Sequence, residues 1–157
     1  MVSTLEDRVQ KAVDFFMQGY GCAQSVAAAF ADLYGFTVDQ AKLVGAGFGG
    51  GIGRLRMMCG AVSGMVILAG MDSGQTDGSD RQGKADCYRL TQDLVAAFKE
   101  ENGSVICAEL LGLEGPVPAG HFMPAERNAE YYRKRPCVAK VESAARIFAK
   151  YLEKKYE

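Results

Sequence analysis

This 157-residue chain contains five cysteines, but no two of them form a C-x-x-C pair. That absence argues against a thioredoxin-type motif and against a simple zinc ribbon, because both rely on closely spaced cysteine pairs. Any site that these cysteines share must therefore be assembled by folding, from residues tens of positions apart.

The sequence also lacks excess charge and long apolar runs. Its net charge is −1, with 48% apolar and 24% charged residues, so neither nucleic acid nor a membrane is expected as a partner. The longest apolar run, Met57–Met71, is interrupted by Ser63 and falls short of the roughly 20 residues of a membrane span. The N-terminus has no apolar h-region of a signal peptide, so we expect a cytoplasmic protein.

Strand-like alternation and internal repeats are absent, whereas the periodicity of amphipathic helices recurs along the chain. Helices are predicted to begin near Ser3, Cys22, Thr37, Met58, Asp80 and Pro136. The segment Met58–Ala69 is apolar nearly all round, which indicates a central helix covered by the others. We therefore predict an all-α fold: one compact domain over residues 1–157, built as a helical bundle around that helix.

Four of the five cysteines fall at predicted helix N-termini: Cys22, Cys59 and Cys137 begin predicted helices, and Cys107 opens a short turn after Asn102-Gly103-Ser104. At a helix start, unpaired N–H groups and the positive end of the dipole stabilise a thiolate, which is the form that attacks disulfides or binds metal. We predict that these four site cysteines share a common site. The alternative is simple burial, since cysteine is among the most buried residue types. Cys87 lies inside a helix, and we interpret it as structural.

The glycine-rich stretch FGGGIG, residues 48–53, leads towards Cys59. It matches neither the P-loop nor the dinucleotide-binding pattern, so we interpret it as a flexible approach to Cys59, with Arg54 and Arg56 beside an anionic site. The alternative is that both arginines are solvated. Gly60 and Gly64 share one helix face and would let another backbone or a cofactor come close. Arg54, Gly60 and Gly64 are therefore our candidates for cofactor binding.

The segment Gly112–Arg135 holds three of the four prolines and is predicted to be a long irregular connection, functional or partner-binding. Its histidine, His121, is either a ligand or proton donor, or simply exposed. The run Arg133-Lys134-Arg135 either lowers the pKa of the Cys137 thiol or is a solvated basic run.

Five motifs stand in order along the chain: CAQSV from Cys22, FGGGIGR from Phe48, CGAVSG from Cys59, CAELLG from Cys107 and CV from Cys137. With these motifs the sequence resembles the C_GCAxxG_C_C family of redox-active proteins. The resemblance implies that the four site cysteines are the characteristic cysteines of that family. One departure is that Cys59 precedes Gly60, whereas the family name places glycine before the cysteine. The family is also similar to the N-terminal part of split-Soret cytochromes c, but C-x-x-C-H is absent here, so no haem is expected.

Three chemistries remain open for the four site cysteines. They could hold an iron–sulfur cluster, most simply a two-iron one, for electron transfer. They could act as catalytic thiols that form reversible disulfides and exchange electrons with an unknown redox partner protein. They could also hold a structural zinc ion. A rival from another class is a non-catalytic helical binding or dimerisation module, and a homodimer is the expected oligomer because it is the commonest one.

Overall fold

The computed structural model describes residues 4–114 and 119–157, and these fold into α-helices and short 3₁₀ turns. The elements are α1 (Leu5–Met17), α2 (Cys22–Phe30), η1 (Ala31–Tyr34), α3 (Val38–Gly45), η2 (Ala46–Phe48), α4 (Gly60–Ser73), α5 (Arg81–Asn102), α6 (Cys107–Leu110), α7 (Ala129–Lys134) and α8 (Cys137–Lys155). Within the described residues there is no strand beyond one isolated bridge. The predicted all-α fold is confirmed.

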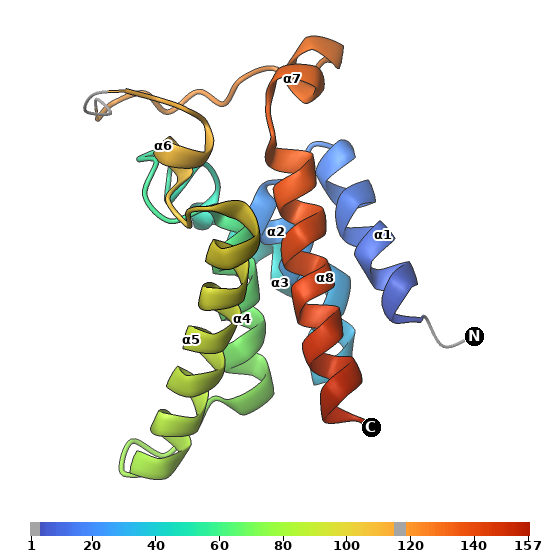
Figure 1. Cartoon of the computed structure of the whole chain (residues 1–157), viewed down its shortest axis with the longest axis vertical. Helices are drawn as coiled ribbons and strands as arrows, with labels where there is room; N and C mark the ends of the chain where they lie inside the picture. The colour runs from blue at the N-terminus through green and yellow to red at the C-terminus, as the bar shows by residue number, and fades with distance from the viewer. Residues whose placement is uncertain (1–3, 115–118) are drawn as a thin grey trace.

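Helix α4 lies at the centre of the bundle, as its apolar sequence predicts. It packs against α2, α5 and α8, while α1 covers the outer side of α2 and α8 (Figure 1). The core between these helices is filled mainly by aromatic and large aliphatic side chains that are fully buried: Phe16, Phe30, Phe98, Phe148, Met65 and Leu68. None of the described helices has the length and hydropathy needed to cross a bilayer.

Glycines allow α4 to approach α2 closely. A Cβ atom on Gly64 would lie 2.7 Å from the Cβ of Val26 and 3.0 Å from the carbonyl oxygen of Ala23. Contacts this short exclude any side chain at Gly64 unless the two helices move apart. The backbone that comes close to the glycine face of α4 is therefore that of α2.

The start of α4 differs from the prediction by two residues. Met58 is not helical but forms an isolated antiparallel bridge with Ile106, and Cys59 is the N-cap of α4. The backbone N–H of Cys59 donates to Val105 O at 2.7 Å, and this long-range pairing keeps the chain extended up to the cap. Helical periodicity cannot reveal a pairing with a segment more than forty residues away.

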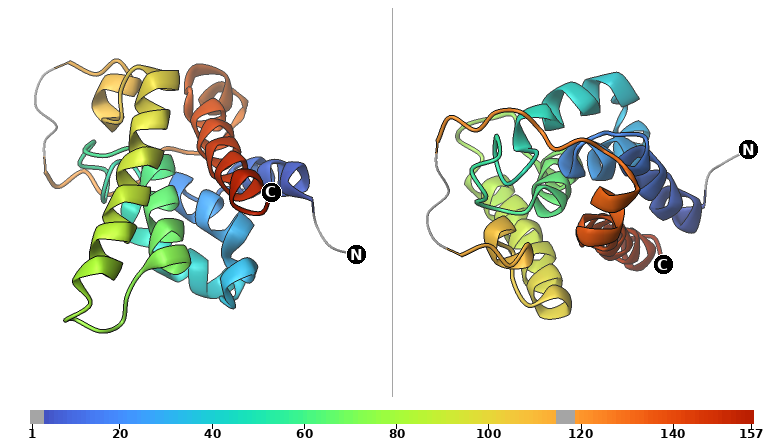
Figure 2. Two further views of the ribbon diagram at one scale, coloured as in Figure 1. Left: turned by 60° about the horizontal axis from the view of Figure 1, so that its bottom comes forward. Right: turned by 90° about the horizontal axis from the view of Figure 1, so that it is seen from above.

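The connection Gly112–Arg135 is less irregular than predicted, because it contains α7. The side chain of Asn128 caps this helix by accepting from the backbone N–H of Tyr131 at 2.9 Å. Seen from above, the chain leading to α7 passes across the end of the bundle at which α8 begins (Figure 2). This crossing brings the connection over the four site cysteines.

Candidate functional site

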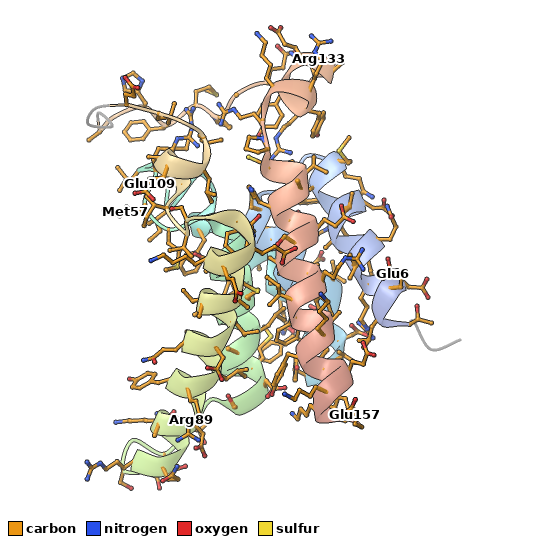
Figure 3. All side chains as sticks on the ribbon, in the orientation of Figure 1. Glu6, Met57, Arg89, Glu109, Arg133 and Glu157 are labelled. Carbon is orange, nitrogen blue, oxygen red and sulfur yellow. The ribbon has the colours of Figure 1, made fainter. Side chains whose placement is uncertain are left out.

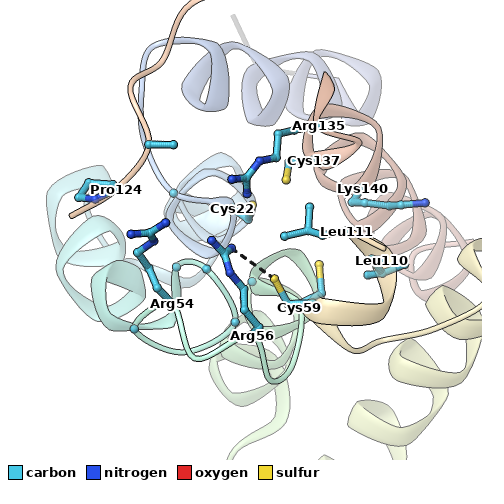
Figure 4. A pocket seen from close by; sticks show the side chains of 18 of the residues that line it. Cys22, Arg54, Arg56, Cys59, Leu110, Leu111, Pro124, Arg135, Cys137 and Lys140 are labelled. Carbon is cyan, nitrogen blue, oxygen red and sulfur yellow. Dashed lines mark hydrogen bonds between the residues drawn. The ribbon is translucent and has the colours of Figure 1, made fainter. Parts of the chain in front are cut away.

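The four site cysteines line a single cavity of about 550 Å³ at one end of the bundle (Figure 4). Each comes from the start of a different helix: Cys22, Cys107 and Cys137 are the first residues of α2, α6 and α8, and Cys59 caps α4. The structure thus brings together the residues that the sequence analysis singled out. Their roles as ligands or catalytic thiols stay predictions.

Backbone pairing holds Cys59 and Cys107 at the cavity. Cys59 N–H donates to Val105 O, and Cys107 N–H donates to Met57 O at 2.5 Å. Both thiols are almost fully buried. Burial raises the pKa of Cys59 to about 11, although the N–H groups of Ala61 and Val62 oppose this shift. Burial also raises the pKa of Cys107, against the opposing effect of Arg56.

Cys22 and Cys137 form a second, directly interacting pair of thiols (Figure 4). The neighbouring Cys22 thiol, together with the charges of Arg135, Arg127 and Arg56, lowers the pKa of Cys137 to about 6, against the opposing effect of burial. The neighbouring Cys137 thiol and burial raise the pKa of Cys22 well above its usual range. Of these two thiols, Cys137 is therefore the one that ionises more readily.

The glycine-rich stretch forms a left-handed turn. Five consecutive residues, Gly50–Arg54, have positive φ values between 53° and 72°, and Arg56 follows at 61°. The turn is closed by backbone hydrogen bonds such as Arg56 N–H to Gly50 O at 3.1 Å. Each non-glycine residue in this conformation costs about 1–2 kcal/mol. Three such residues, Ile52, Arg54 and Arg56, are held in it, which is the kind of strain that proteins retain at functional sites.

The left-handed turn directs two arginines into the cavity, and a third arginine comes from the residue before Pro136. Figure 4 shows the side chains of Arg54, Arg56 and Arg135 directed into the cavity near the thiols. The Arg56 guanidinium donates to Cys107 Sγ at 3.7 Å. No aspartate or glutamate is among the residues that line the cavity. The site is therefore strongly electropositive and suited to anions.

Arg127 was missed by the sequence analysis, yet it anchors the connection above the cavity. Its guanidinium donates to Phe16 O at 2.9 Å and to Tyr20 O at 3.1 Å, at the C-terminal end of α1. It also stacks over the ring of Phe16, 4.2 Å from the centroid. These partners are more than one hundred residues away in sequence, so no local pattern could have revealed them.

The remaining predicted residues divide between the cavity and other places. Gly60 lines the cavity, where a Cβ atom would lie 3.0 Å from the Cβ of Cys22. Gly64 is not among the lining residues and serves the contact between α4 and α2. His121 is exposed on the connection, and only its carbonyl oxygen meets Arg54. Cys87 lies away from the cavity, with its thiol towards Ala69 of α4.

The thiols stand around the cavity rather than around one point. Among residues 4–114 and 119–157, no three His, Cys, Asp or Glu side chains come close enough to hold a single metal ion. A structural zinc ion draws four ligands to about 2.3 Å from one atom, so the arrangement does not fit the zinc alternative.

Comparison with known proteins gives one match. The family described as "Putative redox-active protein (C_GCAxxG_C_C)" matches residues 20–151, a span that includes all four site cysteines. Neither the search of curated proteins nor that of solved structures found a match. Since the matched span covers most of the chain, this protein belongs to the C_GCAxxG_C_C family of redox-active proteins.

Proposed function

We propose that this protein transfers electrons by means of an iron–sulfur cluster held by Cys22, Cys59, Cys107 and Cys137. The observation that carries the proposal is that four thiols from four helix starts line one cavity. Four cysteine thiolates are the usual ligand set of two-iron and four-iron clusters. When bound, such a cluster supplies one-electron chemistry at a potential set by its surroundings.

The charges around the cavity support this proposal. A cluster held by four thiolates is anionic, and the cavity offers arginines and no carboxylates. Arg56 already donates to Cys107 Sγ, and hydrogen bonds to ligand sulfurs are one of the means by which proteins tune cluster potentials. The arginines of the cavity would thus neutralise part of the negative charge of the cysteine thiolates.

The backbone at the helix starts also supports the cysteines as cluster ligands. Cys59 caps α4, and the backbone N–H groups of Ala61 and Val62 act to lower the pKa of its thiol. Such N–H groups favour a thiolate over a thiol. Burial alone holds Cys59 protonated, so a cation must be added before this sulfur is charged at neutral pH, and iron would provide it.

The test is anaerobic purification followed by iron and sulfide analysis and by visible absorption spectroscopy. We expect iron and acid-labile sulfide in the unmodified protein and in the Cys87→Ser variant, whose cysteine lies outside the cavity. Each of the four variants Cys22→Ser, Cys59→Ser, Cys107→Ser and Cys137→Ser should contain much less. Protein that stays free of iron after anaerobic reconstitution would sink the proposal.

A second candidate function is supported by the position of Cys22 and Cys137 beside each other in the cavity (Figure 4). Here the Cys137 thiolate attacks a disulfide of a redox partner protein, and Cys22 then displaces the partner's sulfur. The two thiols lose two electrons and two protons as the Cys22–Cys137 disulfide forms, and the partner's disulfide becomes a dithiol.

Peptide mapping of the oxidised, metal-free protein distinguishes this second candidate from the first. A Cys22–Cys137 linkage that forms and is reduced reversibly, in protein that cannot be loaded with iron, would favour disulfide exchange. An unchanged thiol count after oxidation would exclude it.

A further inference from the structure

Three arginines meet in the cavity without a carboxylate beside them. Arg54, Arg56 and Arg135 all line it, and among the described residues none of them forms an ion pair. All three are partly buried, so water screens their repulsion less than it would on an open surface. An anion in the space between them would therefore be stabilised.

The redox proposal accounts for only one of these arginines by a direct contact. Arg56 donates to Cys107 Sγ. Arg54 instead donates to the carbonyl oxygens of His121 and Met123, and Arg135 stacks on the ring of Tyr131, 5.2 Å from its centroid. Neutral partners of this kind orient a guanidinium group without forming an ion pair with it.

These orientations are built into the fold rather than left to flexible side chains. Arg54 is held in a left-handed backbone conformation, at φ 67°. Arg135 precedes Pro136, which restricts its backbone to the extended conformation observed at ψ 135°. Both charges are therefore preorganised, which reduces the entropy lost when a ligand binds.

The rest of the lining indicates the size and character of the ligand. A cavity of about 550 Å³ lies within the range of small-molecule sites. Beside the arginines, its wall includes the apolar side chains of Leu110, Leu111, Phe122 and Tyr131. Guanidinium groups recognise carboxylates and phosphates with paired hydrogen bonds, and the apolar wall suits a carbon skeleton.

We infer that this cavity binds a small organic anion, whose carboxylate or phosphate group lies between Arg54 and Arg135 and whose apolar part lies against Leu111 and Phe122. The anion would sit beside the thiols of Cys107 and Cys137. This inference goes beyond the redox proposal and holds for the metal-free protein, so the two fail independently. It assigns a small-molecule ligand to a site otherwise considered only for electron transfer.

The test is calorimetric titration of the full-length, reduced, metal-free protein with three probes: inorganic phosphate, phenyl phosphate and benzoate. Chloride at matched ionic strength is the control for screening. We expect saturable binding of phenyl phosphate or benzoate, tighter than that of inorganic phosphate. Binding of phenyl phosphate but not of benzoate would indicate a phosphate ligand. Binding of benzoate but not of phenyl phosphate would indicate a carboxylate ligand.

Charge variants locate the binding site. Arg54→Gln and Arg135→Gln should each weaken binding about tenfold, which corresponds to the loss of one charge-assisted contact. Arg133→Gln is the matched control, because Arg133 is exposed on the outer side of α7 (Figure 3) and does not line the cavity. Equal affinity in all three variants would overturn the inference, and so would the absence of saturable binding.

A second measurement needs no substitution and therefore does not depend on variants that fold. Bound phenyl phosphate or benzoate should slow the alkylation of Cys137 by iodoacetamide, whereas Cys87, outside the cavity, should react at an unchanged rate. If the probes bind but leave both rates unchanged, the anion lies elsewhere and the inference is wrong.

Discussion

Cys107 packs directly against Gly51: a Cβ atom added to Gly51 would lie 2.7 Å from the Cβ of Cys107. The same added atom would lie 2.7 Å from Met57 N. Gly51 also has a φ of 72°, in the left-handed region. Its lack of a side chain therefore serves two purposes, since it allows the left-handed turn and leaves room for a site cysteine.

Gly51→Ala should destabilise the protein more than Gly53→Ala. Both glycines have positive φ values, so both substitutions carry a backbone cost of about 1–2 kcal/mol. An added Cβ at Gly53 meets no atom within 4 Å, whereas at Gly51 it overlaps Cys107, which adds about 1–3 kcal/mol. Urea denaturation measures the difference, and equal destabilisation by the two variants would refute the contact.

The glycines of α4 offer a second matched pair. Gly64→Ala should destabilise by about 1–3 kcal/mol, because its Cβ would overlap Val26 in α2. Gly70→Ala, in the same helix, is exposed and meets nothing within 4 Å, so it should stabilise by about 0.5–1 kcal/mol. Thermal unfolding of the two variants should therefore shift in opposite directions.

The lowered pKa of Cys137 predicts a pH profile for its alkylation. In reduced, metal-free protein, the rate at Cys137 should be low in acid and rise with a midpoint near pH 6, because only the thiolate reacts and the pKa of Cys137 is about 6. Removing the neighbouring thiol with Cys22→Ala, or the charge with Arg135→Gln, should move the midpoint upwards. A midpoint near the ordinary cysteine value of about 8.5 in the unmodified protein would contradict the interaction.

Asp72, which does not line the cavity, predicts that the stability of the protein depends on pH. Its side chain is buried, 2% exposed, and accepts hydrogen bonds from Tyr151, Tyr34 and Lys155. Burial disfavours the charge, but these three donors outweigh it, and the pKa of Asp72 lies below its ordinary value. The stabilisation from Asp72 is therefore present above the unfolded-state pKa of about 3.9 and is lost as the pH falls through the lower folded-state value.

Asp72→Asn should accordingly lower the free energy of unfolding at neutral pH by about 1–3 kcal/mol, because two tyrosines and a lysine lose a charged acceptor. The difference between this variant and the unmodified protein should shrink in acid. Asp93→Asn, at an exposed position of α5, serves as the control and should change stability little. Urea denaturation at neutral and acidic pH is the measurement, and a difference independent of pH would count against the depressed pKa.

Local patterns along the chain account for most of the helices and for the choice of candidate cysteines. Helical periodicity and cap residues depend on neighbours within a few positions, so the central helix was predicted to within two residues at its start and four at its end. The placement of Cys22 and Cys137 as first helical residues follows from the same local signals, whereas the short helix that begins at Cys107 was expected as a turn.

The geometry of the site depends on contacts that no local pattern contains. The bridge between Met58 and Ile106 sets the position of Cys59, and the anchoring of Arg127 on α1 brings the connection across the cavity. Both join segments that are distant along the chain, and many pairings of such segments are compatible with the same periodicity. Residue types and their local order therefore made this an all-α protein with four thiols at helix starts. Packing of the helices placed those thiols around one cavity, and the left-handed turn directed its arginines into that cavity and made it electropositive. Only the folded chain brings such distant side chains into contact.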